Sequence, residues 1–250
     1  MILLIDVGNS NIVFSFSDLN NLYNIFRVET NIDKSSTEYY NLIKIELDKL
    51  EFNDVIISSV VPRITNALND LFIKYYNIEP KILGPNMNTG IILNVDEPNT
   101  VGADLICDAL GAMLYSNEAI IVDLGTATKY IYCKNNVFYG CSIAPGVITS
   151  MKSLFSNTAL LFEIDLNTPK KVISKNTTEC IQSGVIYGAA SQVDGMIIRI
   201  KEELNNFDIP VYATGGLSKL IIPFCKNKIE LMENLTIDGL LAIYKKNFAA

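Results

Sequence analysis

Short runs of β-branched and other apolar residues open the chain and alternate with turn residues. The apolar runs cover Ile2–Asp6, Ile12–Phe16 and Leu22–Val28, and Gly8-Asn9 and residues 18–21 supply the turn signals between them. Such spacing is typical of strands joined by tight turns. The first 28 residues are therefore predicted to form a small antiparallel meander.

Helical and strand-like patterns then follow one another. The predicted elements are a helix over 37–50 capped by Ser35 or Ser36, a strand over 55–59, a helix over 62–76 and a strand over 81–83. Residues 84–100 carry two prolines and several asparagines, which makes this stretch the best linker candidate.

The opening pattern recurs in the second half of the chain. After a predicted helix over 103–115, an apolar strand over 119–123 again ends on an aspartate and precedes two short strands, 129–133 and 137–143. A long helix over 178–204, a strand over 210–213 and a final helix from residue 237 complete the predicted elements.

The two strand-terminal motifs resemble each other closely. Asp6-Val7-Gly8-Asn9-Ser10-Asn11 and Asp123-Leu124-Gly125-Thr126-Ala127-Thr128 share an aspartate, a glycine two residues later and a small polar turn. Internal similarity of this kind indicates a duplicated unit. We expect an α/β fold of two similar lobes, residues 1–99 and 100–250, with both turns on one cleft and with helix 103–115 a candidate to cross between them.

Composition narrows the chemistry. A hydrophobic fraction of 49% with 19% charged residues is that of a packed, soluble protein, and the net charge of −7 argues against nucleic acid as a primary ligand. No membrane span or signal peptide is evident, so a cytoplasmic location is expected.

The five cysteines show no close pair, which disfavours disulfide or zinc sites. Histidine is absent, so a general base must be a carboxylate, Lys, Tyr or Cys.

The two aspartate-glycine turns suit a phosphorylated ligand. A glycine lets backbone amides approach a phosphate closely, and a strand-terminal aspartate offers a hard oxygen to Mg²⁺. One such turn alone is more often a simple hairpin. In Ala213-Thr214-Gly215-Gly216-Leu217-Ser218, a predicted strand runs through two glycines into a helix. Two aspartate-glycine turns in register, together with this motif, favour nucleotide binding, although neither a Rossmann nor a P-loop fingerprint is present.

Asp104 is the candidate base. It follows Val101-Gly102-Ala103 at the start of a predicted helix. By itself, a carboxylate in the first turn would be interpreted as a charge that interacts favourably with the helix dipole. Beside bound ATP, the same carboxylate would accept the proton of an attacking hydroxyl group.

These motifs resemble those of the type III pantothenate kinases, which have an actin-like ATPase fold. The likeness spans nearly the whole chain and also includes Ser58-Ser59-Val60-Val61-Pro62, Ile143-Ala144-Pro145-Gly146, Asn176-Thr177 and Gln182-Ser183-Gly184. It implies two actin/ribonuclease H-like lobes, each a mixed sheet flanked by helices, with an ATP cleft between them. It also implies a homodimer that phosphorylates the primary hydroxyl group of pantothenate with ATP, Mg²⁺ and a monovalent cation, K⁺ or NH₄⁺, as the first step towards coenzyme A.

The resemblance assigns roles to individual positions. Asp104 would be the base, Asp6 and Asp123 would serve the metal, and Gly102, Asp104 and Thr177 would contact pantothenate. The ATP phosphates would meet the glycine-rich turns at Asp6, Gly8, Asn9, Ser10, Gly125, Thr126, Gly215 and Gly216.

Several positions depart from the family pattern. Leu105 stands where the family has an arginine that helps to hold the substrate, Val95 stands near an expected tyrosine, and the other departures are Asp108 for asparagine, Lys129 for threonine and Cys141 for glycine. Two alternatives therefore stay open: a kinase for another small alcohol, or a non-catalytic nucleotide-binding regulator similar to Bvg accessory factors.

Overall fold

The computed structural model describes residues 1–249 and consists of two compact units. The first comprises residues 1–115, 136–138 and the chain from Asn234 onward, and the second comprises residues 116–135 and 139–233. This division differs from the expected one at residue 99/100. Helices predicted for the second lobe, over 103–115 and from 237, belong to the first unit because they cover one face of its sheet.

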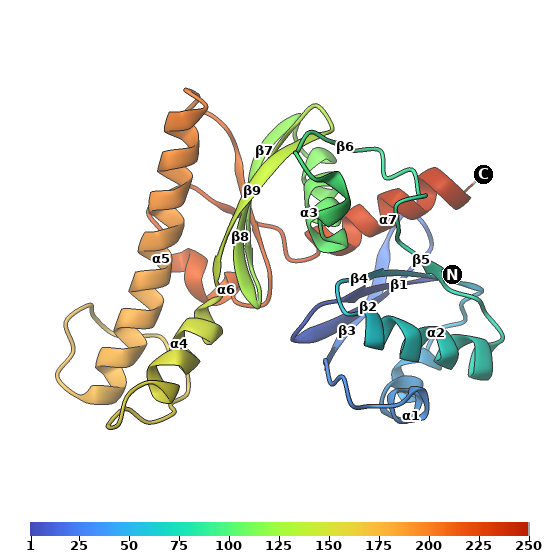
Figure 1. Cartoon of the computed structure of the whole chain (residues 1–250), viewed down its shortest axis with the longest axis horizontal. Coiled ribbons are helices and arrows are strands. Elements are labelled where there is room, and N and C mark those ends of the chain that lie inside the picture. The colour runs from blue at the N-terminus through green and yellow to red at the C-terminus, as the bar shows by residue number, and fades with distance from the viewer. Residues whose placement is uncertain (250) are drawn as a thin grey trace. The chain divides into compact units, whose positions relative to one another are not determined.

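The sheet of the first unit has the strand order β3-β2-β1-β4-β5 (Figure 1). Its strands are β1 (Ile2–Val7), β2 (Asn11–Ser17), β3 (Leu22–Glu29), β4 (Asp54–Ser59) and β5 (Lys81–Ile82). The first three form the predicted antiparallel meander, whereas β4 is parallel to β1 and β5 is parallel to β4. The meander and the strands after it are thereby confirmed.

Both faces of this sheet are buried, which explains why its central strands are apolar almost without interruption. Leu3, Ile5 and Ile57 face one cluster, which includes residues of α1 (Ser36–Leu47) and α2 (Pro62–Tyr76). The alternate positions Leu4 and Ile56 face the other cluster, which includes residues of α3 (Ala103–Met113) and α7 (Leu235–Phe248). Successive side chains of a strand point to opposite faces, so each face receives its own helices.

Local signals fix the helix boundaries of the first unit. Ser35 caps α1 and forms a capping box with Glu38, which satisfies amides that the first turn leaves unpaired. Pro62 occupies the first turn of α2, and Asn77 ends that helix in the left-handed conformation.

Helices α3 and α7 pack at two glycines. A Cβ atom at Gly111 would lie 2.2 Å from the carbonyl oxygen of Leu235, and one at Gly239 would lie 1.9 Å from that of Cys107. No larger residue fits at either crossing point, so the glycines set how closely the two helices approach.

The sheet of the second unit repeats the topology of the first. Strands β7 (Glu118–Leu124), β8 (Ala127–Lys134), β9 (Val137–Pro145), β10 (Val211–Thr214) and β11 (Glu230–Leu231) have the order β9-β8-β7-β10-β11. As in the first unit, β7 is antiparallel to β8 and parallel to β10, and β10 is parallel to β11. The predicted duplication is confirmed at the level of topology.

One face of the second sheet packs against α5 (Thr177–Glu203), the long helix labelled in Figure 1. Ile120 and Val122 of β7 belong to the same core cluster as Ile186, Val193 and Ile197 of α5. The first residues of β9 belong to the first unit, where Val137 and Phe138 pair in parallel with β6 (Ile92–Leu93).

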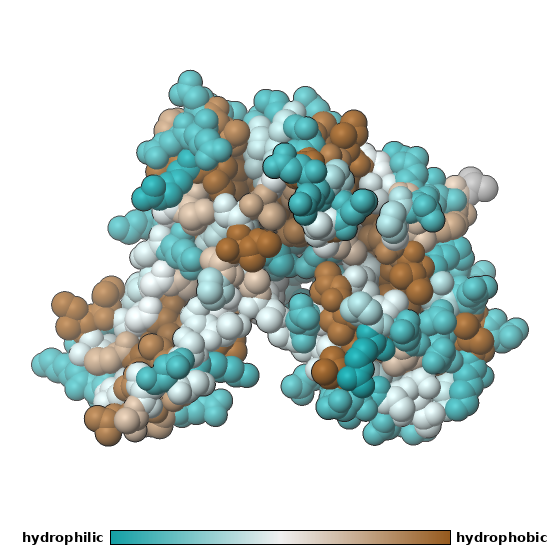
Figure 2. Space-filling model, in the orientation of Figure 1, coloured by the Kyte–Doolittle hydropathy of each residue, from teal (hydrophilic) through white to brown (hydrophobic). Residues whose placement is uncertain are grey.

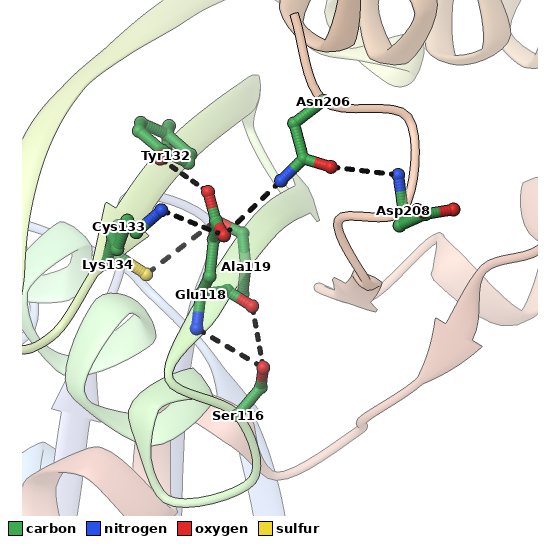
Figure 3. A network of polar contacts seen from close by, with 8 residues as sticks. All are labelled: Ser116, Glu118, Ala119, Tyr132, Cys133, Lys134, Asn206 and Asp208. Carbon is green, nitrogen blue, oxygen red and sulfur yellow. Dashed lines mark hydrogen bonds and ion pairs between the residues drawn. The ribbon is translucent and has the colours of Figure 1, made fainter. Parts of the chain in front are cut away.

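A polar network joins the start of β7 to its neighbours (Figure 3). The Glu118 carboxylate accepts hydrogen bonds from Tyr132 Oη at 2.7 Å, Lys134 Nζ at 3.2 Å and Asn206 Nδ2 at 3.4 Å. Lys134 lies directly opposite Glu118 in the β7–β8 register, so this pair ties the two strands together at the end far from the Gly125 turn.

Several elements were not predicted from the sequence. They are α4 (Val147–Ser156), the short strands β6 and β11, and the 3₁₀ turns η1 (Pro98–Thr100) and η2 (Ile222–Phe224). Helix α6 (Ser218–Ile221) corresponds to the helix expected after Gly216. Among residues 1–249, no helix has the length and apolar character needed to cross a membrane.

Candidate active site

The turn between β1 and β2 is tight and well supported. The Gly8 amide donates to the Asn11 carbonyl oxygen at 3.0 Å, and a Cβ atom at Gly8 would lie 3.2 Å from that same oxygen. Thr30 buttresses the turn, because its hydroxyl group donates to the Gly8 carbonyl oxygen at 2.7 Å. Asn9 and Ser10 are exposed at the tip, as residues that meet a soluble phosphate must be.

Asp6 lies beside this turn and is held from the neighbouring strand. Ser58 faces it in the β1–β4 register and donates from Oγ to Asp6 Oδ1 at 3.1 Å. The hydrogen bond orients the Asp6 carboxylate. Ser58 lies in a motif that carries the family resemblance, yet sequence reasoning gave it no role.

Asp104 stands in the first turn of α3, whose N-cap residue is Gly102. Its Oδ1 accepts a hydrogen bond from the Leu105 amide at 2.9 Å. A Cβ atom at Gly102 would lie 2.5 Å from that oxygen, so glycine is needed for the carboxylate to keep this position. Val60, which follows β4, is 3.6 Å from the same Cβ position, so the start of α3 lies by the end of β4.

The surroundings of Cys107 show that the carboxylates of Asp6 and Asp104 lie in one region of the first unit. Burial raises the pKa of its thiol well above the usual value, and the negative charges of Asp6, Asp108 and Asp104 raise that pKa further. Cys107 is completely buried, and the three residues whose charges act on it are all aspartates. The structure therefore brings the predicted base and the predicted metal-binding aspartate together around one buried thiol.

The corresponding turn of the second unit is built around Asp123. The Gly125 amide donates to the Ala127 carbonyl oxygen at 3.2 Å, which closes the turn after β7. Gly215 follows the neighbouring strand β10 with a positive φ of 91°, and a Cβ atom there would lie 2.4 Å from Asp123 Oδ1. The predicted residues Asp123, Gly125 and Gly215 thus lie in direct contact.

Helix α4 is anchored on the same turn. A Cβ atom at Gly146, its N-cap residue, would lie 2.2 Å from the Thr126 carbonyl oxygen. The Thr149 hydroxyl group donates to that carbonyl oxygen at 3.0 Å. Gly216 is exposed next to Gly215, as a residue that meets a nucleotide should be.

Thr177 lies in another part of the second unit. It is the first residue of α5, after the N-cap Asn176, and it lines a cavity of about 800 Å³. Residues of α4 and α5, among them Leu154 and Ile181, form its apolar wall.

The carboxylates differ in their ability to hold a cation. Within residues 1–249, no three acidic or cysteine side chains converge on one metal position. A magnesium ion bound to nucleotide phosphates needs only one or two protein carboxylates, so Asp6 suits that role. Asp123 differs, because its Oδ2 is 2.7 Å from the ammonium group of Lys129.

A family model described as type III pantothenate kinase matches residues 2–199. The chain belongs to the type III pantothenate kinase family. This match covers both aspartate-glycine turns, Asp104 and Thr177.

Curated members of the type III pantothenate kinase family resemble the chain over its full length. The type III pantothenate kinase of Acholeplasma laidlawii is 45% identical over 247 residues, which cover 99% of both chains. That of Exiguobacterium sp. is 40% identical over 254 residues, again 99% of both. The chain is therefore a kinase, a phosphotransferase that acts on an alcohol group.

Among solved structures, a Baf family protein from Campylobacter jejuni, described as a transcriptional activator, has a TM-score of 0.59. The two share 19% sequence identity, and the alignment covers 98% of each chain. At this identity the likeness concerns the fold alone. Together with the repeated sheet topology, it supports the predicted actin-like class.

The departures from the family pattern have different surroundings. Leu105 is buried on α3, with 7% of its surface exposed, so it packs in the interior of the protein. Asp108 is also buried and accepts a hydrogen bond from Thr236 Oγ1 at 2.5 Å. Lys129 was noted in the sequence only as a departure, and its pairing with Asp123 was missed because the two residues meet through strand register.

Proposed function

We propose that this type III pantothenate kinase transfers the γ-phosphoryl group of ATP to the primary hydroxyl group of pantothenate, forming 4'-phosphopantothenate in the first step of coenzyme A synthesis. The observation that carries the proposal is the placement of Asp104 and Asp6 around Cys107. Phosphoryl transfer needs a group that receives the hydroxyl proton near the groups that handle the phosphates.

In the proposed reaction, the pantothenate hydroxyl oxygen forms a bond to the γ-phosphorus atom while the bond from that atom to the ADP oxygen breaks. Asp104 receives the hydroxyl proton. The Gly8 turn, with Asn9 and Ser10 at its tip, would bind phosphate oxygens through backbone amides and side chains. Mg²⁺, for which Asp6 would be a ligand, supplies charge neutralisation when bound.

Other predicted features remain proposals. A monovalent cation, K⁺ or NH₄⁺, and the cytoplasmic location stay predictions from the sequence. Gly102 and Thr177 are proposed to contact pantothenate.

We also propose that the protein is a homodimer. Four large apolar side chains of the loop between α4 and α5 are exposed, and we call them the apolar rim: Leu160 (89%), Phe162 (55%), Val172 (63%) and Ile173 (83%). Figure 2 shows hydrophobic surface over this loop, at the lower left of the view. The rim adjoins the cavity that Thr177 lines, and a second copy of the chain would cover both.

Leu105, which stands where the family has an arginine, motivates one alternative, a different small alcohol as acceptor. A leucine side chain donates no hydrogen bond, and loss of a charged partner costs about 1.5–3 kcal/mol of binding energy. A screen of small hydroxy compounds for ATP consumption separates the two acceptors.

The deciding experiment measures ADP production by the purified protein with ATP, Mg²⁺ and K⁺, with and without pantothenate. Pantothenate-dependent ADP together with a phosphorylated product by mass spectrometry is the expected result. Stimulation by another alcohol and not by pantothenate would refute the proposed acceptor.

A further inference from the structure

Asp123 and Lys129 form an ion pair within the β-sheet of the second unit. They lie directly opposite each other in the β7–β8 register, and Lys129 Nζ is 2.7 Å from Asp123 Oδ2. The side chain of Lys129 is only 16% exposed and that of Asp123 only 12%. The ammonium group therefore already occupies one face of a carboxylate that the family resemblance assigned to a metal.

The first unit shows that the fold does not require a lysine here. Its corresponding aspartate, Asp6, faces Val13 across β1 and β2. The repeat thus places an apolar residue in one unit and a cation in the other, at the same position relative to an aspartate-glycine turn.

The glycines locate the ion pair at the turn itself. A Cβ atom at Gly125 would lie 3.4 Å from Asp123 Oδ1 and 3.6 Å from Oδ2, and the clash at Gly215 involves Oδ1. The carboxylate is therefore packed between the two glycine turns, with Lys129 on its other oxygen. The ammonium group of Lys129 is therefore fixed beside the two turns that are proposed to bind phosphates.

Stability alone is a weak reason for such a pair. Removing two charges from water is costly, and a mostly buried ion pair often contributes little more than apolar residues would. A lysine ammonium group is, in contrast, an effective point charge for binding phosphate.

We propose that Lys129 is a phosphate-binding residue of this kinase, and that Asp123 positions its ammonium group instead of binding a metal ion. The inference rests on the proposed use of ATP but not on the identity of the acceptor. It replaces the role predicted for Asp123 and gives one to a residue that the family pattern left unexplained.

The test compares Lys129→Met and Lys129→Gln with the wild-type protein by calorimetry. Binding of ADP is measured in EDTA, so that no divalent metal contributes, and binding of adenosine serves as the phosphate-free reference. Loss of a charged contact predicts a roughly tenfold to hundredfold weaker affinity for ADP and an unchanged affinity for adenosine. The KM for ATP should rise with it, while the KM for pantothenate stays the same.

Lys134→Met is the matched control, because it removes the other cross-strand lysine–carboxylate pair of β7 and β8. It should leave ADP affinity unchanged. Equal ADP affinity in all variants would overturn the inference, as would equal losses for ADP and adenosine or failure of both Lys129 variants to fold. If pantothenate does not stimulate ADP production by the wild-type protein, pantothenate is refuted as the acceptor. The comparison of ADP affinities still decides the role of Lys129.

Discussion

Asp104 has the position expected of a proton acceptor, at the start of a helix and beside the charges of Asp6 and Asp108. Asp104→Asn keeps the shape of the side chain but removes its basicity. We expect kcat to fall by about 10²–10⁴-fold while ADP affinity stays within about twofold. Steady-state kinetics and calorimetry measure the two quantities.

Asp33→Asn is a suitable control for that substitution, since Asp33 is exposed and belongs to the 30–35 loop. It should retain wild-type turnover. Full turnover in Asp104→Asn would remove the proposed base.

At the level of single residues, the sequence predicted those whose chemistry is local. Gly8 and Gly125 could be recognised because tight turns after strands need glycine, and Asp104 because it opens a helix. Ser58 and Lys129 could not, because only their pairing with Asp6 and Asp123 across strands brings them to these carboxylates. That pairing depends on the register of neighbouring strands, which cannot be read directly from a single sequence.

Among the elements, α3 and α7 depend on each other through their glycines. Gly239→Ala would place a methyl group 1.9 Å from the Cys107 carbonyl oxygen, so the helices must move apart. Overpacking of this kind costs about 1–3 kcal/mol or more of unfolding free energy. Because Asp104 is in the same helix as Cys107, kcat should also fall; chemical denaturation and kinetics measure the two effects.

Gly195→Ala provides the contrasting case. Gly195 lies within α5, and a Cβ atom there meets nothing within 4 Å. Alanine is favoured over glycine inside a helix by up to about 1 kcal/mol, so this variant should be at least as stable as the wild type. Equal effects of the two substitutions would contradict the proposed role of the α3–α7 crossing.

The stability of the first unit should depend on pH through Asp54. Burial raises the pKa of Asp54 on β4, but hydrogen bonds from Lys81 on β5 and Tyr244 on α7 outweigh it, so the pKa lies below its usual value. A lowered pKa in the folded state stabilises the protein above the unfolded pKa of about 3.9, and this contribution is lost as pH falls through the folded pKa.

Lys81→Met should therefore reduce the unfolding free energy by about 1–3 kcal/mol at pH 7, with a smaller deficit below pH ~4. Denaturant titrations at several pH values measure it. Lys49→Met, which removes the exposed pair with Glu46, should change the unfolding free energy far less than Lys81→Met does. A Lys81→Met deficit that is independent of pH would show that the ion pair is not its cause.

Periodicity predicted the long elements well and the short ones poorly. Helix α2 begins and ends at the predicted residues because Pro62 opens it and Asn77 ends it. Helix α1 stops at Leu47 instead of residue 50, and Asp48 is its C-cap residue. Strand β6 has only two residues, and it exists because it pairs with β9, so no local pattern could have revealed it.

For the whole molecule, the proposed dimer gives a direct prediction. Ile173→Glu puts a charge on a side chain that is 83% exposed in the single chain, so monomer stability should be nearly unchanged. In a dimer interface, the same charge would be buried without a partner. Analytical ultracentrifugation should show a dissociation constant raised at least about tenfold.

Ile45→Glu, at a 70% exposed position on α1, is the control and should leave association unchanged. A wild-type protein that is monomeric at micromolar concentrations would argue against the dimer. A dimer unaffected by Ile173→Glu would move the interface away from the apolar rim.

The duplicated architecture followed from sequence because both copies retain an aspartate-glycine turn after a buried strand. The assignment of α3 and α7 to the first unit did not, because no local pattern states which sheet an apolar helix face will cover. Leu240 and Ile243 could have packed against either sheet, and only the assembled core shows that they join Leu4 and Ile56.

The placement of α7 in the first unit also affects the order in which the two units can fold during translation. A ribosome releases the N-terminal sheet early, yet α7, one of the two helices that cover the face bearing Leu4 and Ile56, is translated only after residues 116–233. Residues 116–233, by contrast, have emerged almost completely by then. Until α7 has been made, only α3 covers that face, so apolar residues of the first unit stay open to chaperones and proteases while the second unit is translated.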